Sequence, residues 1–162
     1  MENMSGLQKT LAKALARRFT ENAARIDELA GPLSDAQFWT KPFPFGNSFG
    51  HLVLHLTGNL NYYIGAQIAK TGYVRDRECE FAERDPPSKD EALERLHDVV
   101  AIVLATIGKQ SAEDWSADYS AVGTDCANRL EIFVQCAAHM QHHIGQMIYL
   151  VSELHRQAGS KQ

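Results

Sequence analysis

Two long segments of this chain carry no charged side chain, and they constrain its fold more than any other feature. Residues 42–69 and 132–152 contain no Asp, Glu, Lys or Arg, yet they hold five of the seven histidines. Each segment is long enough to cross a bilayer. The second, however, contains three glutamines and three histidines, and the first contains two prolines and three asparagines. These groups are costly in lipid, so we expect both segments to form helices in a protein core rather than in a membrane.

The overall charge and the cysteines set the expected environment. The 162 residues include 16 Lys or Arg and 20 Asp or Glu, a net charge of −4, which gives no electrostatic reason to expect nucleic acid or an anionic membrane as a partner. Three cysteines without a CxxC pair argue against a disulfide framework, and the first ten residues lack the layout of a signal peptide. We therefore expect a cytoplasmic protein with a single domain over residues 1–162.

Apolar residues recur at helical spacing in four stretches, and no stretch alternates as a strand does. Ser34 and Ser88 each begin a capping-box pattern, which predicts a short turn of helix after Ser34 and a long helix after Ser88. The sequence therefore predicts an all-α fold, a four-helix bundle with long connectors. The predicted long helices cover residues 7–30, 47–70, 88–107 and 129–156.

The connectors are long for a helical bundle. Residues 71–87 form a stretch of 17 residues, which could reach about 56 Å if fully extended. Helices of the predicted lengths make a bundle only about 30–40 Å long. The chain can therefore cross the bundle between its second and third helices, so a simple up-down-up-down topology is not required. Residues 111–127 are expected to form another connector.

The histidines in the two uncharged segments are spaced as metal ligands. His139 and His143 are four residues apart, about 40° on a helical wheel, so both imidazoles lie on one face of the last predicted helix. His51 and His55 have the same spacing in the second helix, and either could join the first pair. His142 could replace His143 through its i, i+3 spacing from His139.

A lone helical histidine is more often a hydrogen-bonded side chain than a ligand. Here, however, neither segment contains a carboxylate that could pair with a buried imidazole. Three neutral imidazoles would hold a divalent ion and leave a coordination position open for water or substrate. Imidazole discriminates poorly among Zn, Ni, Co, Mn and Fe, so the residues alone leave the metal open.

Three stretches of the chain resemble the DinB/YfiT-like four-helix metalloproteins. They are residues 47–59 (NSFGHLVLHLTGN), 75–81 (RDRECEF) and 139–146 (HMQHHIGQ), and the likeness covers nearly the whole chain. The resemblance implies a DinB-like topology with a crossover between helices two and three. It also implies a three-histidine site for Zn or Ni, and it implies a homodimer.

The family pattern places the metal ligands at His55, His139 and His143 of this sequence. Ala138 stands where the family usually has Asn, and Ile144 stands where it usually has Arg. These departures leave the ligands in place but remove polar groups beside them. Some relatives transfer low-molecular-weight bacterial thiols, and others are regarded as hydrolases, so the resemblance implies the site more sharply than the reaction.

Several other residues are weaker candidates for a functional role. Gln146 could orient a ligand or substrate, or bond only to the backbone. The thiol of Cys136 could approach the metal, although an inert buried thiol is the more common case. An acidic run could reach the mouth of the site or form a solvated face, and four aromatic residues could line an apolar pocket or belong to the core. The acidic run is Asp76, Glu78 and Glu80, and the aromatic residues are Trp39, Phe43, Phe45 and Tyr63.

The sequence leads to one functional hypothesis and two alternatives. The first is a metal-dependent enzyme that activates a thiol or water toward a small-molecule substrate, with thiol S-transfer favoured by the family resemblance. The second is a metal-dependent hydrolase. The third is a non-catalytic bundle that binds metal or dimerises. No residue is assigned as catalytic, because no Ser or Cys stands beside a credible base and no general base is evident in the helices.

Overall fold

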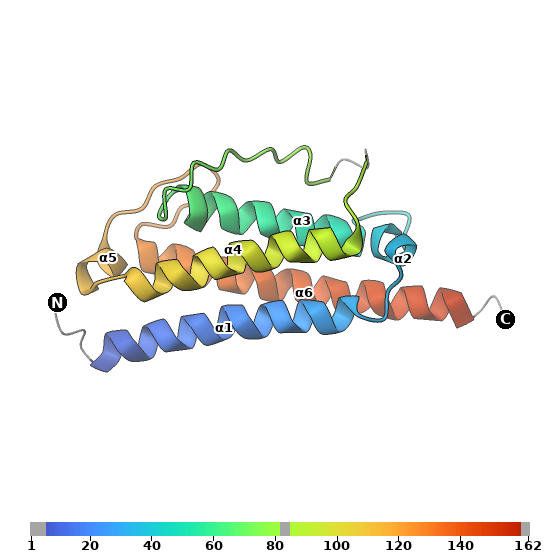
Figure 1. Ribbon diagram of the computed structural model, residues 1–162, viewed down its shortest axis with the longest axis horizontal. Coiled ribbons are helices and arrows are strands. Elements are labelled where there is room, and N and C mark those ends of the chain that lie inside the picture. Colours follow the sequence, from blue (N-terminus) through green and yellow to red (C-terminus); the bar gives the residue numbers. More distant parts are fainter. Residues whose placement is uncertain (1–5, 82–84, 160–162) are drawn as a thin grey trace.

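The computed structural model describes residues 6–81 and 85–159, and within them the chain is helical with no β-strand. The prediction of an all-α fold is confirmed for this part of the chain. Four long segments lie side by side along the longest axis (Figure 1). They are α1 (Gly6–Ala30), α3 (Phe49–Leu60) with its continuation η1 (Asn61–Ala66), α4 (Lys89–Lys109) and α6 (Arg129–Gly159).

Each long helix packs against two others, so the four close around one core. Helix α1 contacts α4 and α6, and α3 contacts the same two helices from the opposite side. Apolar residues at helical spacing supply the contact faces, and their burial drives the association. The largest fully buried side chains include Phe19 of α1, Phe49 of α3, Leu96 of α4 and Phe133 of α6.

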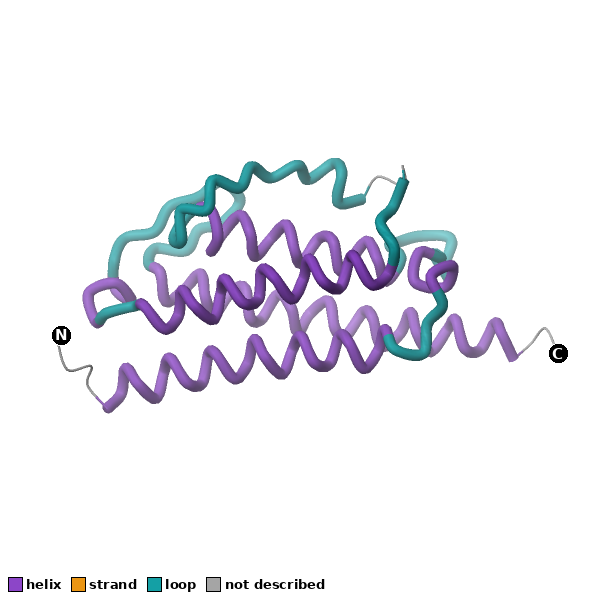
Figure 2. The backbone as a smooth tube through the Cα atoms, viewed as in Figure 1, coloured by secondary structure: helices purple, strands orange, loops and turns teal. Residues whose placement is uncertain are grey.

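The connector between η1 and α4 takes an extended path along the outside of the bundle. Figure 2 shows it as a long loop that runs from the end where η1 stops to the end where α4 begins. As a result, α3 and α4 run in the same direction, although they are consecutive long helices. Residues 82–84 of this connector lie outside the described part of the chain. The connector passes beside α3, which brings residues 75–81 close to the middle of that helix.

The second predicted helix differs from expectation in its last turns. Instead of a continuous α-helix to residue 70, α3 ends at Leu60 and a π-helical turn follows. Bonds with i, i+5 spacing form from Gln67 N–H to the Tyr62 carbonyl and from Ala69 N–H to the Ile64 carbonyl. The Tyr119 hydroxyl donates to the Tyr63 carbonyl at 2.9 Å. This tertiary bond satisfies a carbonyl within the widened turn, and sequence periodicity cannot anticipate it.

Two short helices complete the fold. Helix α2 (Asp35–Trp39) begins at Ser34 with the predicted capping box. At Ser88, which caps α4, the side chain accepts from Glu91 N–H, but the reciprocal Glu91 bond of a full box is not found. The predicted connector at 111–127 contains an extra helix, α5 (Ala112–Ser116), which a capping box at Ser111 starts. Its Trp115 is buried, which explains why these residues order as a helix.

Candidate metal centre

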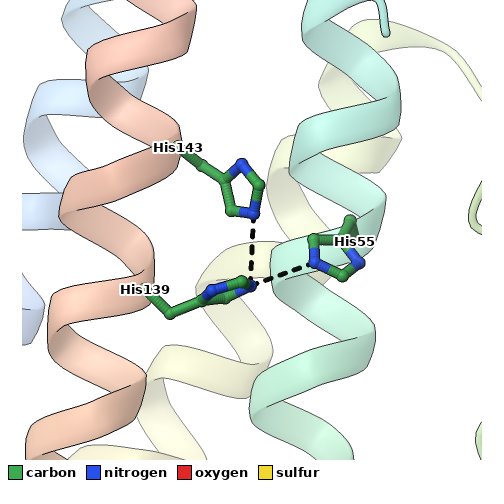
Figure 3. A group of neighbouring side chains, drawn as sticks. All are labelled: His55, His139 and His143. Atoms are coloured by element: carbon green, nitrogen blue, oxygen red, sulfur yellow. Dashed lines mark hydrogen bonds between the residues drawn. The ribbon is translucent and has the colours of Figure 1, made fainter. Parts of the chain in front are cut away.

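Three histidines from two helices direct one ring nitrogen each toward a common point (Figure 3). His55 lies in the middle of α3, and His139 and His143 lie one turn apart on α6. The His139 Nε2 atom is 3.0 Å from His55 Nε2 and 3.2 Å from His143 Nε2. Two nitrogens bound tetrahedrally to zinc at about 2.0–2.1 Å lie about 3.3–3.4 Å apart. The donor set and its spacing therefore fit one divalent ion.

A carboxylate from the connector orients His55. Glu80 is only 6% exposed, and its Oε2 accepts a hydrogen bond from His55 Nδ1 at 2.9 Å. Arg75 donates two hydrogen bonds to the same carboxylate, from Nε to Oε1 at 2.6 Å and from Nη2 to Oε2 at 2.9 Å. The bond to Nδ1 leaves the Nε2 lone pair of His55 free to face the other histidines. Carboxylate–histidine pairs of this kind fix the tautomer and orientation of metal ligands.

The ion pairing also keeps Glu80 charged. Burial alone would raise the pKa of this carboxyl, but the hydrogen bonds from His55 and Arg75 hold it below its usual value. Phe81, the next residue, packs its ring against His55 with centroids 5.1 Å apart. The connector thus covers one side of His55, with a hydrogen bond from Glu80 and a ring contact from Phe81.

Gly58 is what allows Glu80 to come so close to α3. It lies one turn after His55, and a Cβ atom at this position would overlap the Glu80 carboxylate. Interior helical glycine costs about 1 kcal/mol relative to alanine. The close approach of the carboxylate is therefore a physical reason for a glycine at this position of the helix.

A second polar residue orients His143. Its Nδ1 donates to Gln146 Oε1 at 2.7 Å, which again directs Nε2 toward the cluster. The Gln146 amide nitrogen lies 3.3 Å from Nε2 of His142, a residue exposed on the outer side of α6. Of the two roles considered for Gln146, the structure shows the one in which it orients a candidate ligand. His142 stays outside the three-histidine group.

The environment of the cluster favours neutral imidazoles. Burial, followed by the neighbouring His143 and His55, lowers the pKa of His139 to about 4. Burial likewise lowers the pKa of His143, with the Gln146 hydrogen bond opposing it. A neutral imidazole offers a lone pair to a metal and a protonated one does not. The site is therefore ready to bind a cation at neutral pH.

His51 does not belong to the three-histidine group and instead takes part in capping α3. Its imidazole forms the second half of the capping box at the start of α3, where Nδ1 accepts from Ser48 N–H at 3.2 Å. The ring also packs edge-on against Trp39, with centroids 5.7 Å apart. The histidine pair of this helix is thus divided between a structural cap and the metal centre.

The acidic run, Cys136 and the four aromatic residues also divide into residues near the three histidines and residues with structural positions. Within the acidic run, only Glu80 reaches the centre, and Asp76 and Glu78 are exposed. Cys136 is 1% exposed and burial raises the pKa of its thiol, as expected of an inert buried cysteine. The four aromatic residues do not share one pocket. Tyr63 lines a cavity beside the centre, Phe43 and Phe45 line a different one, and Trp39 packs over Gly50.

Sequence reasoning missed the Arg75–Glu80–His55 chain of contacts. It considered Glu80 only as one member of an acidic run that reaches the mouth of the site or forms a solvated face, and it assigned no role to Arg75. Two features of the sequence could have pointed to these contacts. One is Gly58, a glycine inside a predicted helix, and the other is the charged connector that follows that helix. These features indicate a close approach but do not identify the group that approaches.

A cavity opens beside the three histidines. Its volume is about 470 Å³, which is within the usual range for small-molecule sites. The edges of His55 and His139 form part of its wall, so a molecule in the cavity lies next to the candidate metal position. Other parts of its wall come from the connector at Arg75 and Arg77 and from the loop around Gly123.

Comparison with known proteins identifies the family. The pattern of the DinB superfamily matches residues 18–147, which is most of the chain, so this protein belongs to the DinB superfamily. The fold is similar to that of a conserved protein from Enterococcus faecalis, with a TM-score of 0.72 and 18% sequence identity over 88% of this chain and 95% of that chain. The chain matches no curated protein. No described helix is long and apolar enough to span a membrane.

Proposed function

We propose that this protein is a metal-dependent enzyme in which His55, His139 and His143 hold one divalent ion, zinc or nickel. The observation that carries this proposal is the convergence of three Nε2 atoms, two of them in rings whose Nδ1 donates to Glu80 or Gln146. The path of the connector along the bundle supports the crossover topology that the family resemblance implies.

The proposed reaction is the transfer of a thiol to a small electrophilic substrate. His55, His139 and His143 would hold the ion, which would lower the pKa of a bound thiol or water and so supply a nucleophile near neutral pH. Glu80 and Gln146 hold the histidines in orientation, and the 470 Å³ cavity admits the reactants beside them. A low-molecular-weight thiol is the proposed second substrate.

The composition of the cavity wall supports thiol transfer over hydrolysis. No Asp or Glu is among the described residues that line it. The carboxylate behind the wall, Glu80, is bonded to His55 and Arg75 and kept ionised, so it cannot take up a proton easily. Activation of water usually needs a positioned general base as well as a metal. A thiol ionises more readily and needs less assistance.

The first experiment measures metal in untagged protein purified without nickel resin. We expect close to one zinc or nickel ion per chain, or uptake of one equivalent after the protein is treated with a chelator. Protein that contains no metal and takes up neither ion would refute the proposed centre. The matched variants are His55→Ala, which should lose the ion, and His51→Ala, which should keep it.

The second experiment tests the reaction with metal-loaded protein. Thiol consumption is followed with a panel of electrophiles, and ester and amide hydrolysis is followed in parallel. Hydrolysis without thiol consumption would favour the hydrolase alternative. Full metal loading with neither activity would favour a non-catalytic metal-binding bundle. The homodimer implied by the family resemblance is part of the same proposal, and sedimentation equilibrium measures it.

A further inference from the structure

The wall of the 470 Å³ cavity is rich in hydrogen-bond donors and poor in negative charge. It contains two arginines, two side-chain amides and the edges of two histidines, but no Asp or Glu among the described residues. The whole chain, in contrast, has a net charge of −4. The described wall of this cavity is therefore less acidic than the chain as a whole. The lining residues used below are Asn59, Arg75, Arg77 and Gln135.

Asn59 is a buried amide whose side chain has no hydrogen-bond partner among residues 6–81 and 85–159. It lies one helical turn after His55, on the same face of α3, and only 8% of the residue is exposed. Its side chain makes no hydrogen bond with any described residue, yet it lines the cavity. Buried amides are nearly always hydrogen-bonded, because leaving them unpaired is costly. The amide is open to the cavity rather than sealed from it, so a molecule bound there can supply the partner.

The two arginines of the cavity differ in what they can bind. Arg75 is committed to Glu80 through two bonds, so its charge is neutralised inside the protein. Arg77 makes no ion pair within the described chain, and it is an exposed residue that lines the same cavity. A guanidinium presents a planar fork of donors that matches a carboxylate. Arg77 is therefore the available anion-binding group.

Gln135 adds a third donor at the edge of the cavity. Its Oε1 accepts from the Thr124 hydroxyl at 2.7 Å. With its oxygen engaged, the amide NH₂ of this cavity-lining residue makes no hydrogen bond within the described chain. Asn59, Arg77 and Gln135 thus come from a helix, the connector and another helix, and all three offer donors to one space.

We propose that this cavity is a carboxylate-binding subsite, in which Arg77 and Asn59 donate to an acidic group of a reactant that lies beside the metal centre. The proposal rests on the proposed function and deepens it by naming the substrate class, a small organic acid. A divalent ion held by three neutral histidines adds to the positive field, which strengthens the attraction for an anion. The acid group can belong to the thiol or to the molecule that the thiol attacks.

Calorimetric titration of zinc-loaded protein tests the subsite with three probes. They are 3-mercaptopropionate, its methyl ester and propionate. We expect the thiol acid to bind about 10-fold more tightly than the ester, because a charge-assisted hydrogen bond is lost with the carboxylate. If the acid belongs to the thiol reactant, 3-mercaptopropionate binds more tightly than propionate. If it belongs to the other reactant, the two acids bind equally. Either pattern supports the subsite.

Two variants connect the preference to the named residues. Arg77→Gln should remove the preference for the acid over the ester and leave the ester affinity and the zinc content unchanged. Because Arg77 is exposed, its replacement does not disturb the core. Asn59→Asp keeps the shape of the side chain and places a negative charge in the cavity, so it should weaken both acids more than the ester. Arg17→Gln is the control, because it makes the same charge change on the exposed face of α1 and should have no effect.

The possible failures are distinguishable. If zinc binds but acid and ester bind equally, or if Arg77→Gln weakens both equally, the subsite is refuted and the metal centre stands. If zinc does not bind at all, the proposed function is refuted and the subsite, which depends on it, is refuted as well.

Discussion

Replacement of Gly58 by alanine separates helix propensity from the needs of the metal centre. Alanine in place of glycine inside a helix gains about 1 kcal/mol. At this position, however, the new Cβ atom would overlap the Glu80 carboxylate and push it away from His55. A hydrogen bond to a charged group contributes about 1.5–3 kcal/mol, and the two bonds from Arg75 to the same carboxylate are disturbed as well.

The loss exceeds the gain, so we expect Gly58→Ala to lower the free energy of unfolding of the metal-free protein by about 1–3 kcal/mol. Displacement of Glu80 also releases the orientation of His55. Loss of a partner of this kind reduces metal affinity by about 10- to 100-fold. Urea unfolding of metal-free protein gives the first quantity, and zinc competition against a chromogenic chelator gives the second.

Gly145→Ala is the matched control. Gly145 lies inside α6, next to Gln146, and a Cβ atom there meets no other atom within 4 Å. This substitution should stabilise the protein by about 1 kcal/mol and leave zinc affinity unchanged. If Gly58→Ala behaves like Gly145→Ala in both measurements, the close contact between Glu80 and α3 does not support the metal centre, and the reasoning is wrong.

Three further predictions address the ligands, the buried thiol and a helix cap. Alanine at His55 or His143 should abolish zinc binding measured by equilibrium dialysis, whereas alanine at His51 or His142 should not; equal losses at all four positions would contradict the assignment. Cys136, which is 1% exposed, should react with iodoacetamide only after unfolding, as mass spectrometry of the native and urea-treated protein can show. Asp114→Asn should lower the free energy of unfolding by about 1 kcal/mol at neutral pH, since the Asp114 carboxylate completes the capping box of α5 by accepting from Ser111 N–H and also pairs with Arg129. Bonds from Ser111, followed in smaller part by Arg129, lower the pKa of Asp114. Its contribution is therefore present above the unfolded pKa of about 3.9 and disappears as the pH falls through the lower folded value, so urea unfolding at several pH values should show the variant and wild type converging in acid.

The arrangement within each helix was predictable from the sequence. His139 and His143 lie on one face of α6 because the α-helix repeats every 3.6 residues, whatever surrounds it. The capping box at Ser34 formed for a similarly local reason, since all of its atoms belong to four consecutive residues. The widened turn after Leu60 was not predictable in this way, because the Tyr119 hydroxyl that bonds to it comes from a distant segment.

The choice between His51 and His55 shows where local reasoning stops. Spacing alone places both on nearly the same face of α3, and only the family resemblance selected His55. In the structure, His51 is in the first turn of the helix, where its Nδ1 accepts from the N–H of the N-cap Ser48, and His55 is one turn further on, opposite α6. The position of α3 relative to α6 depends on the packing of the whole core, which no single helix encodes.

By itself, the sequence determined that the described chain is helical, that its two uncharged segments lie in helices that pack on a protein core, and that histidines are presented in pairs. Only the tertiary structure decided that one histidine of α3 meets the α6 pair, that Glu80 and Arg75 reach it across 20 to 25 residues of chain, and that Asn59 and Arg77 face one cavity. The physical reason is that helix geometry fixes the directions of side chains within an element. The path of a long connector and the relative placement of helices are fixed instead by the packing of the completed fold.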